Sequence, residues 1–173
     1  MKKLLLVVSL ATLFGCADSH NLNVNSTTNT PKIKASDSVY IALSKDGSYG
    51  KRHYTGSGMM LSQVINSRLM VRLNNVEMAT QVQSYSDAIA SAKEGGYNYL
   101  VYPTILHWED RATEWSGIPD KVSVKVSVIN THNESDIKSA VIEGTSGLMT
   151  FGGDHPQDLL PEPIEAFAKQ LFE

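Results

Sequence analysis

The clearest pattern in the sequence is a strict alternation of valine with lysine or serine over residues 121–129. Successive side chains of an extended chain point to opposite faces, so the valines share one face and the polar side chains share the other. This segment is predicted to be a strand with one buried and one exposed face. A polar turn over residues 130–136 leads to residues 137–144, which we expect to be its antiparallel partner.

Three other short runs are rich in β-branched, aromatic and other apolar residues, which is typical of strands. They are residues 38–43, 76–82 and 97–108. The last run is apolar enough to be central in a sheet, and Pro103 should interrupt its hydrogen-bond ladder.

Helices are predicted where apolar residues recur at a spacing of three and four. These segments are residues 59–73, 84–93 and 159–172. The second segment has Ser84 at its start and Gly95 just past its end, which is the pattern of a capped helix. The third carries Pro161 and Pro163 in its first turn, where a missing backbone N–H costs little.

The predicted order of elements is β-α-β-α-β-β-β-α. Right-handed crossovers place the first three strands in the order 2-1-3, and the hairpin strands then add beyond strand 3. We therefore expect an α/β fold with a mixed five-stranded sheet of order 2-1-3-4-5 and helices on both faces. A length of 173 residues fits one globular domain, which we assign to residues 37–173.

The start of the chain has the pattern of an export signal. Two lysines precede an apolar run over residues 4–14, which is too short for a membrane-spanning helix of about 20 residues. The following Leu13-Phe14-Gly15-Cys16 resembles a bacterial lipobox, in which cleavage before the cysteine is followed by its acylation. We expect residues 1–15 to be a lipoprotein signal peptide and Cys16 to carry the acyl chains. The alternative is a lone cysteine in an ordinary secretory signal.

The residues after the cysteine predict a destination and a linker. Ala17, rather than an aspartate, follows Cys16. By resemblance to the enterobacterial sorting rule, this implies an outer-membrane lipoprotein that faces the periplasm. Residues 17–36 are rich in Asn, Ser and Thr and hold little to bury. Residues 16–36 are therefore predicted to be the lipidated cysteine and a flexible tether, which would reach roughly 25 Å.

Composition excludes several classes of function. The 15 Lys and Arg against 18 Asp and Glu are spread along the chain, so no basic stripe indicates a nucleic-acid partner. The single cysteine cannot form an internal disulfide. The five histidines show neither a His-x-x-x-His nor a His-Glu-x-x-His spacing, so we expect no metal and no cofactor.

One segment carries a family resemblance. Residues 102–117, Tyr-Pro-Thr-Ile-Leu-His-Trp-Glu-Asp-Arg-Ala-Thr-Glu-Trp-Ser-Gly, with Pro119-Asp120 and the alternating valine strand, resemble an uncharacterised family of proteobacterial lipoproteins known only as a domain of unknown function. The succession of elements behind a lipobox is also similar to the TolB amino-terminal-domain, or anticodon-binding-like, fold of periplasmic adaptor lipoproteins. The likeness covers roughly residues 38–172. It implies an architecture, and no catalytic or binding residue follows from it.

The predicted topology brings three loops together. Strands 1, 3 and 5 run the same way, so residues 44–58, 109–120 and 145–158 should leave the sheet at one edge, which we call the three-loop edge. The candidate recognition residues there are Arg52, His53, Trp108, Glu109, Asp110, Arg111, Glu114, Trp115 and His155. In this interpretation the tryptophans offer apolar area and the charged residues set orientation. In the other interpretation the loops only pack on one another, carboxylates hold Arg111, and the tryptophans cover the core.

Catalytic patterns are weak in this sequence. Residues 47–52 resemble a phosphate-binding loop, but Lys45 stands where the first glycine belongs and Arg52 where a hydroxyl is needed. Glu109-Asp110 and Asp154-His155 are carboxylate and histidine neighbours of the kind that is more often solvated than catalytic. We therefore expect no catalytic residue.

Together these patterns predict a non-catalytic outer-membrane lipoprotein that binds an envelope protein or assembles with copies of itself. The alternative is a small-molecule or glycan-binding domain, or a hydrolase, that uses the three-loop edge.

Overall fold

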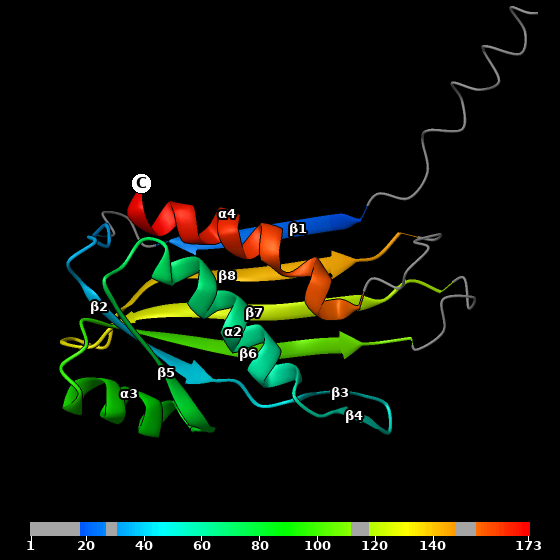
Figure 1. Ribbon diagram of the computed structural model, residues 1–173, viewed down its shortest axis with the longest axis horizontal. Coiled ribbons are helices and arrows are strands. Elements are labelled where there is room, and N and C mark those ends of the chain that lie inside the picture. The colour runs from blue at the N-terminus through cyan, green and yellow to red at the C-terminus, as the bar shows by residue number, and fades with distance from the viewer. Residues whose placement is uncertain (1–17, 27–30, 112–117, 148–154) are drawn as a thin grey trace, which may run out of the picture.

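The computed structural model of the chain describes residues 18–26, 31–111, 118–147 and 155–173. Within these ranges the chain forms a six-stranded sheet in the order β1-β8-β7-β6-β2-β5 and a two-stranded sheet, β3-β4 (Figure 1). The strands are β1 (Ser19–Ser26), β2 (Ser38–Leu43), β3 (Gly47–Tyr49), β4 (Arg52–Tyr54), β5 (Asn75–Val82), β6 (Tyr99–Glu109), β7 (Lys121–Asn130) and β8 (Asp136–Thr145). The helices are α2 (Ser57–Met70), α3 (Tyr85–Glu94) and α4 (Pro161–Phe172), with a short 3₁₀ turn, η1 (Pro156–Leu159), before α4.

The main sheet confirms the predicted mixed α/β class. β2 pairs in parallel with β5 and β6, and β6, β7 and β8 follow as antiparallel neighbours. The five predicted strands take the predicted order 2-1-3-4-5, which is β5-β2-β6-β7-β8. A sixth strand, β1, adds to the free edge of β8.

The prediction of a flexible tether over residues 16–36 is wrong for residues 19–26, which form β1. Ser19–Ser26 pairs antiparallel with β8 over its whole length. Leu22 and Val24 pack against the core, and the intervening asparagines alternate with them along the strand. Beyond this strand, Ile33 is buried and its backbone N donates to Leu171 O (2.9 Å). The folded domain therefore includes residues that composition alone assigned to a linker, because the edge of β8 supplies their backbone partners.

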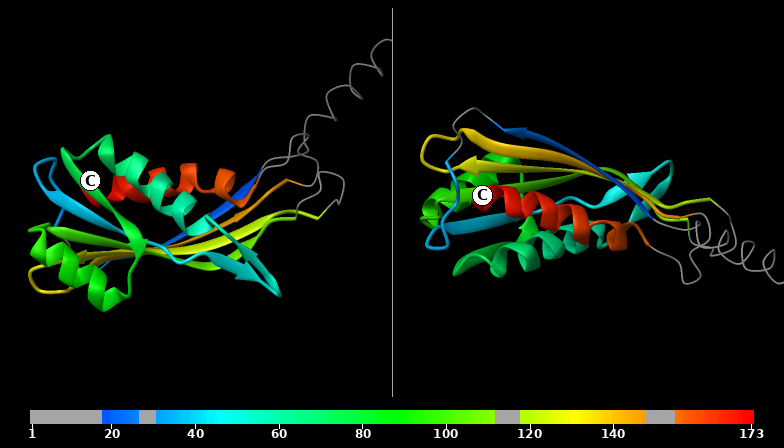
Figure 2. Two further views of the ribbon diagram at one scale, coloured as in Figure 1. Left: turned by 60° about the horizontal axis from the view of Figure 1, so that its bottom comes forward. Right: turned by 90° about the horizontal axis from the view of Figure 1, so that it is seen from above.

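Helices cover both faces of the sheet, as predicted. Figure 2 shows α2 and α4 on one face and α3 on the other. The alternating valines of β7, Val122, Val124, Val126 and Val128, are buried on the face that α2 and α4 cover. α3 buries Ala88, Ile89 and Ala92 in a smaller cluster with Tyr40, Leu43 and Leu100. The Ser84 side chain accepts a hydrogen bond from Asp87 N (3.2 Å), which confirms the predicted cap of α3.

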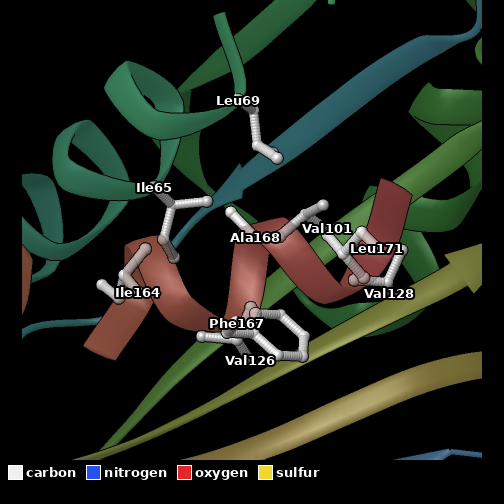
Figure 3. A pocket seen from close by; sticks show the side chains of 9 residues that line it. All are labelled: Ile65, Leu69, Val101, Val126, Val128, Ile164, Phe167, Ala168 and Leu171. Carbon is white, nitrogen blue, oxygen red and sulfur yellow. The ribbon is translucent and has the colours of Figure 1, made fainter. Parts of the chain in front are cut away.

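The contact between α2, α4 and the sheet is close and wholly apolar. Figure 3 shows α4 beside α2 over the strands, with side chains from both helices and from the sheet facing one another. They enclose a gap of about 10 Å³. These side chains are Ile65, Leu69, Val101, Val126, Val128, Ile164, Phe167, Ala168 and Leu171. A gap of this size barely reaches the volume that one water needs, so it belongs to the core and not to a ligand site.

Candidate functional site

The described parts of the three loops lie at one end of the sheet (Figure 1). The Tyr54 hydroxyl, in the loop after β2, donates to the backbone oxygen of Asp110, which follows β6 (3.4 Å). His155, in the segment after β8, places Nδ1 3.5 Å from Asp110 Oδ2. Asp120 N donates to the Ser146 hydroxyl (2.8 Å), which joins the second loop to the third. Each of the three loops thus contacts another at its described residues.

A small hairpin occupies the loop after β2, where the sequence predicted irregular chain. β3 and β4 pair through a two-residue turn over residues 50–51. Gly50 has φ 59° at the first position of this turn, a conformation that suits glycine and a hairpin. A side chain at Gly47 would lie 2.6 Å from Trp108 Cβ, so glycine allows the hairpin to approach the end of β6 closely.

A network of polar contacts lies at the end of β6. Glu109 is only 3% exposed, and its carboxylate pairs with the Arg111 guanidinium and with His107 Nε2 (3.3 Å). Arg111 N also donates to Asp120 Oδ1 (2.5 Å). A buried carboxylate is stable only when cations or donors surround it, so these contacts hold Glu109 in place. For Arg111, this is the arrangement that the packing interpretation predicted.

Asp120 is the titratable group of this network with a shifted pKa. Its burial raises the pKa of its carboxyl above the usual value of 3.8, and the hydrogen bond from Arg111 N acts in the opposite direction. The nearby Asp110 and Glu109 carboxylates raise this pKa further, while His155 lowers it. The protonation of Asp120 therefore depends on how the loops of the three-loop edge pack around it.

Between the hairpin and the end of β6 lies an open cleft of about 410 Å³. It is lined by Tyr49, Gly50, Lys51, Arg52, Tyr54, Glu109, Asp110 and Arg111. Lys51 and Arg52 are exposed, and neither forms an ion pair with a residue that the structure describes. The hairpin side of the cleft thus carries two cations without an ion-pair partner among the described residues, whereas Glu109 and Asp110 on the opposite side contact Arg111 and His155.

The candidate recognition residues fall into three groups. Arg52 and His53 are exposed on β4, and His155 is exposed beside Asp110. Glu109, Asp110 and Arg111 form the network at the end of β6. Glu114 and Trp115 lie outside the described residues.

Trp108 corrects the prediction that both tryptophans offer surface area. It is 2% exposed and belongs to the main core cluster, because it faces the same side of the sheet as its register partner Val122. Tyr49, Lys51 and Asp120 were not among the candidates, although all three lie at the edge. A glycine between short β-prone runs at residues 47–54 was the signal that could have revealed the hairpin.

The described residues hold neither a cluster of metal ligands nor a membrane-spanning helix. Among them, no group of three or more His, Cys, Asp or Glu side chains is placed to hold a metal ion. None of their helices has the length and apolar character needed to cross a membrane.

A family model matches residues 31–171 of this sequence. The chain belongs to the family described as Domain of unknown function (DUF4823). The resemblance to an uncharacterised family is thereby confirmed, and the likeness to the TolB amino-terminal domain stays a prediction. No curated protein matches the DUF4823 chain.

The fold of this chain also occurs in a solved structure. The PelC dodecamer from Paraburkholderia phytofirmans is similar with a TM-score of 0.68 and 14% identity, covering 89% of this chain and 98% of that one. A DUF330 protein from Xanthomonas campestris has a TM-score of 0.48 and 10% identity, over 86% and 87% of the two chains. A lipoprotein from Neisseria meningitidis has a TM-score of 0.46 and 15% identity, over 78% and 97%.

Proposed function

We propose that this DUF4823 protein is an outer-membrane lipoprotein, anchored through acyl chains on Cys16 and facing the periplasm, whose α/β domain is a non-catalytic interaction module. The module uses the three-loop edge as a contact surface with the envelope. It binds an envelope protein or assembles with copies of itself.

The observation that carries this proposal is that the carboxylates of the three-loop edge have partners within the protein, whereas its cations Lys51 and Arg52 are exposed. The carboxylates that could serve acid–base chemistry have neighbours within the protein: Glu109 contacts Arg111 and His107, and Asp110 Oδ2 lies 3.5 Å from His155 Nδ1. What the edge presents outward is Lys51, Arg52 and the half-exposed ring of Tyr49. Exposed cations and aromatic rings of this kind suit recognition.

Two further observations support anchoring and self-association. The lipobox-like Leu13-Phe14-Gly15-Cys16 precedes the domain directly. The PelC structure, which shares the fold, is a dodecamer. Both are consistent with a membrane-bound module that meets other copies at the membrane surface.

Anchoring is tested by comparing the wild type with Cys16→Ser in cells. We expect the wild type to incorporate labelled palmitate and to fractionate with the outer membrane, and the variant to do neither. A Cys16→Ser protein that still fractionates with the outer membrane would refute the lipid anchor.

The interaction is tested by in-cell crosslinking from photoreactive residues at Tyr49 on the edge, Lys125 on β7 and His132 in the turn at the opposite end of the sheet. All three positions are exposed. We expect a protein adduct from at least one position, with twice the chain mass for self-association or another mass for an envelope protein. Absence of any protein adduct at all three positions contradicts the interaction module.

The cleft favours one alternative, a small-molecule or glycan-binding function. Its volume of about 410 Å³ lies within the range of ligand sites, and Tyr49, Tyr54 and Arg52 line it. Calorimetric titration with a panel of neutral and acidic sugars tests this. Binding that Arg52→Ala abolishes and Lys125→Ala leaves intact would support it, and no heat with any sugar would exclude glycans.

A further inference from the structure

The position of β1 determines which end of the domain lies next to Cys16. A row of register partners crosses β6, β7, β8 and β1 at this end of the sheet. Glu109 pairs with Lys121, Lys121 with Thr145, and Thr145 with Ser19. Three strand spacings place Ser19 about 15 Å from Glu109. β1 therefore starts at the three-loop edge and runs away from it, as its direction in Figure 1 shows.

Asp18 ties the start of β1 to this edge. Gly147 N, just past the end of β8, donates to Asp18 Oδ1 (3.1 Å). Only two residue steps separate Asp18 from Cys16, and an extended chain spans at most about 7 Å over two residues. The headgroup layer on one side of a bilayer is about 5–8 Å thick. With acyl chains on Cys16, the distance between the hydrocarbon core of the bilayer and the three-loop edge is therefore about the thickness of the headgroup layer.

The exposed chemistry of the edge fits such a surface. Lys51 and Arg52 at the tip of the β3-β4 hairpin are exposed and have no ion-pair partner among the described residues. Tyr49 beside them is 45% exposed, and Ile118 at the same end is 48% exposed. Basic side chains attract lipid phosphates, and tyrosine favours the layer between water and hydrocarbon.

We propose that the three-loop edge is the membrane-facing end of the domain, and that Lys51 and Arg52 of the β3-β4 hairpin dock on the phosphate groups of the bilayer that holds the anchor. This inference rests on the proposed lipid anchor and names the envelope component that the edge contacts. In this orientation, contacts with envelope proteins or with other copies are made by the faces of the domain that do not meet the bilayer. The domain lies against the membrane and is not held roughly 25 Å away by a tether.

The test uses the full-length lipidated protein in vesicles of phosphatidylethanolamine and phosphatidylglycerol that contain a lipid with a nitroxide quencher on its headgroup. A fluorescent thiol label is placed by Ser48→Cys on the hairpin or by His132→Cys in the turn after β7. Both positions are exposed, and the ten residues of β7 separate the two ends of the sheet by roughly 30 Å. We expect the quencher to remove most of the emission at position 48 and little at position 132.

Equal quenching at the two positions, or stronger quenching at position 132, would overturn the inference. Vesicle flotation separates this failure from failure of the anchor. If the lipidated protein floats with the vesicles but the labels are quenched equally, only the orientation is wrong. If it does not float, or if Cys16→Ser floats equally well, the anchor and the orientation both fail.

Charge reversal tests the role of the hairpin cations. In the vesicle assay, Lys51→Glu with Arg52→Glu should weaken quenching at position 48. In the unacylated Cys16→Ser protein, the same pair should reduce binding to the anionic vesicles by more than about fivefold per residue, since each change removes a positive charge and adds a negative one. The matched control is Lys32→Glu with Lys34→Glu, two exposed lysines before β2 at the opposite end of the sheet. An equal loss with the control pair would show that only net charge matters and would refute docking through the hairpin.

Discussion

The face of the sheet under α2 and α4 and the three-loop edge are held together by different kinds of contact. Apolar side chains such as Phe167, Ile164 and Val126 pack on this face and bury nonpolar surface area without directional bonds. The edge is held by directed polar contacts, with Glu109, Arg111 and Asp120 at their centre. Stability should therefore depend mainly on the face, while the exposed part of the edge can change with little effect on folding.

The largest effect is expected from the face. Phe167 is 2% exposed and lines the same apolar gap as side chains of α2 and of the sheet (Figure 3). Phe167→Ala should lower the free energy of unfolding by about 3–5 kcal/mol, because it removes buried area and leaves a cavity. Urea denaturation followed by circular dichroism measures this. Phe172→Ala, at a partly buried position of the same helix, should cost clearly less, and equal losses would contradict the comparison.

The junction between the two regions should give the next largest effect. At Gly47 an added Cβ would meet Trp108 Cβ at 2.6 Å and Ile105 Cγ2 at 2.9 Å. Gly47→Ala should therefore lower the free energy of unfolding by about 1–3 kcal/mol through overpacking. Ser48→Ala, at the exposed neighbouring position, should change it by less than about 0.5 kcal/mol in the same urea titration. A neutral Gly47→Ala would mean that the hairpin is free to move off β6.

A pH dependence distinguishes the edge from the face. Because the pKa of Asp120 is raised in the folded state, this group favours folding most below its unfolded value of 3.8. Its contribution is lost as the pH rises through the raised pKa. Asp120→Asn should therefore remove a decline in stability as the pH rises above 3.8, while its side-chain oxygen can still accept from Arg111 N.

Urea denaturation of wild type and Asp120→Asn across this pH range measures the difference. Asp87→Asn, at the exposed start of α3, is the matched control. The same pH profile in wild type and Asp120→Asn would show that the protonation of Asp120 does not affect the free energy of unfolding.

The smallest effect on folding is expected at the tip of the hairpin. Lys51→Glu with Arg52→Glu should change the free energy of unfolding by no more than about 0.5 kcal/mol, since both side chains are exposed and unpaired among the described residues. A loss above 1 kcal/mol would mean that these residues hold the edge together. It would also remove them as candidates for a recognition surface.

Much of the fold could be predicted because its signals are local. The alternating valines of β7, the cap at Ser84 and the paired prolines of α4 each act through neighbouring residues. The handedness of crossovers then orders the strands. Within the described residues, the five predicted strands have ends that differ from the structure by no more than two residues.

The errors share a physical cause, which is that the partner lies far away in the chain. The segment that forms β1 has the composition of a linker, yet the unpaired edge of β8 makes it a strand. Leu22 and Val24 at alternate positions were its only local sign. Trp108 could be placed in the core only once the register with β7 was known and Gly47 had brought the hairpin onto β6.

For this protein, the sequence by itself determined the mixed α/β class, the order of five strands and the edge at which three loops meet, because periodicity, capping and crossover handedness are properties of short segments. Only the tertiary structure decided that Glu109 and Arg111 hold each other, that Trp108 is core, and that β1 starts at the three-loop edge. These depend on which surfaces meet after folding. The last of them places Asp18, two residues after Cys16 in the sequence, at the same end of the molecule as the exposed cations of the hairpin.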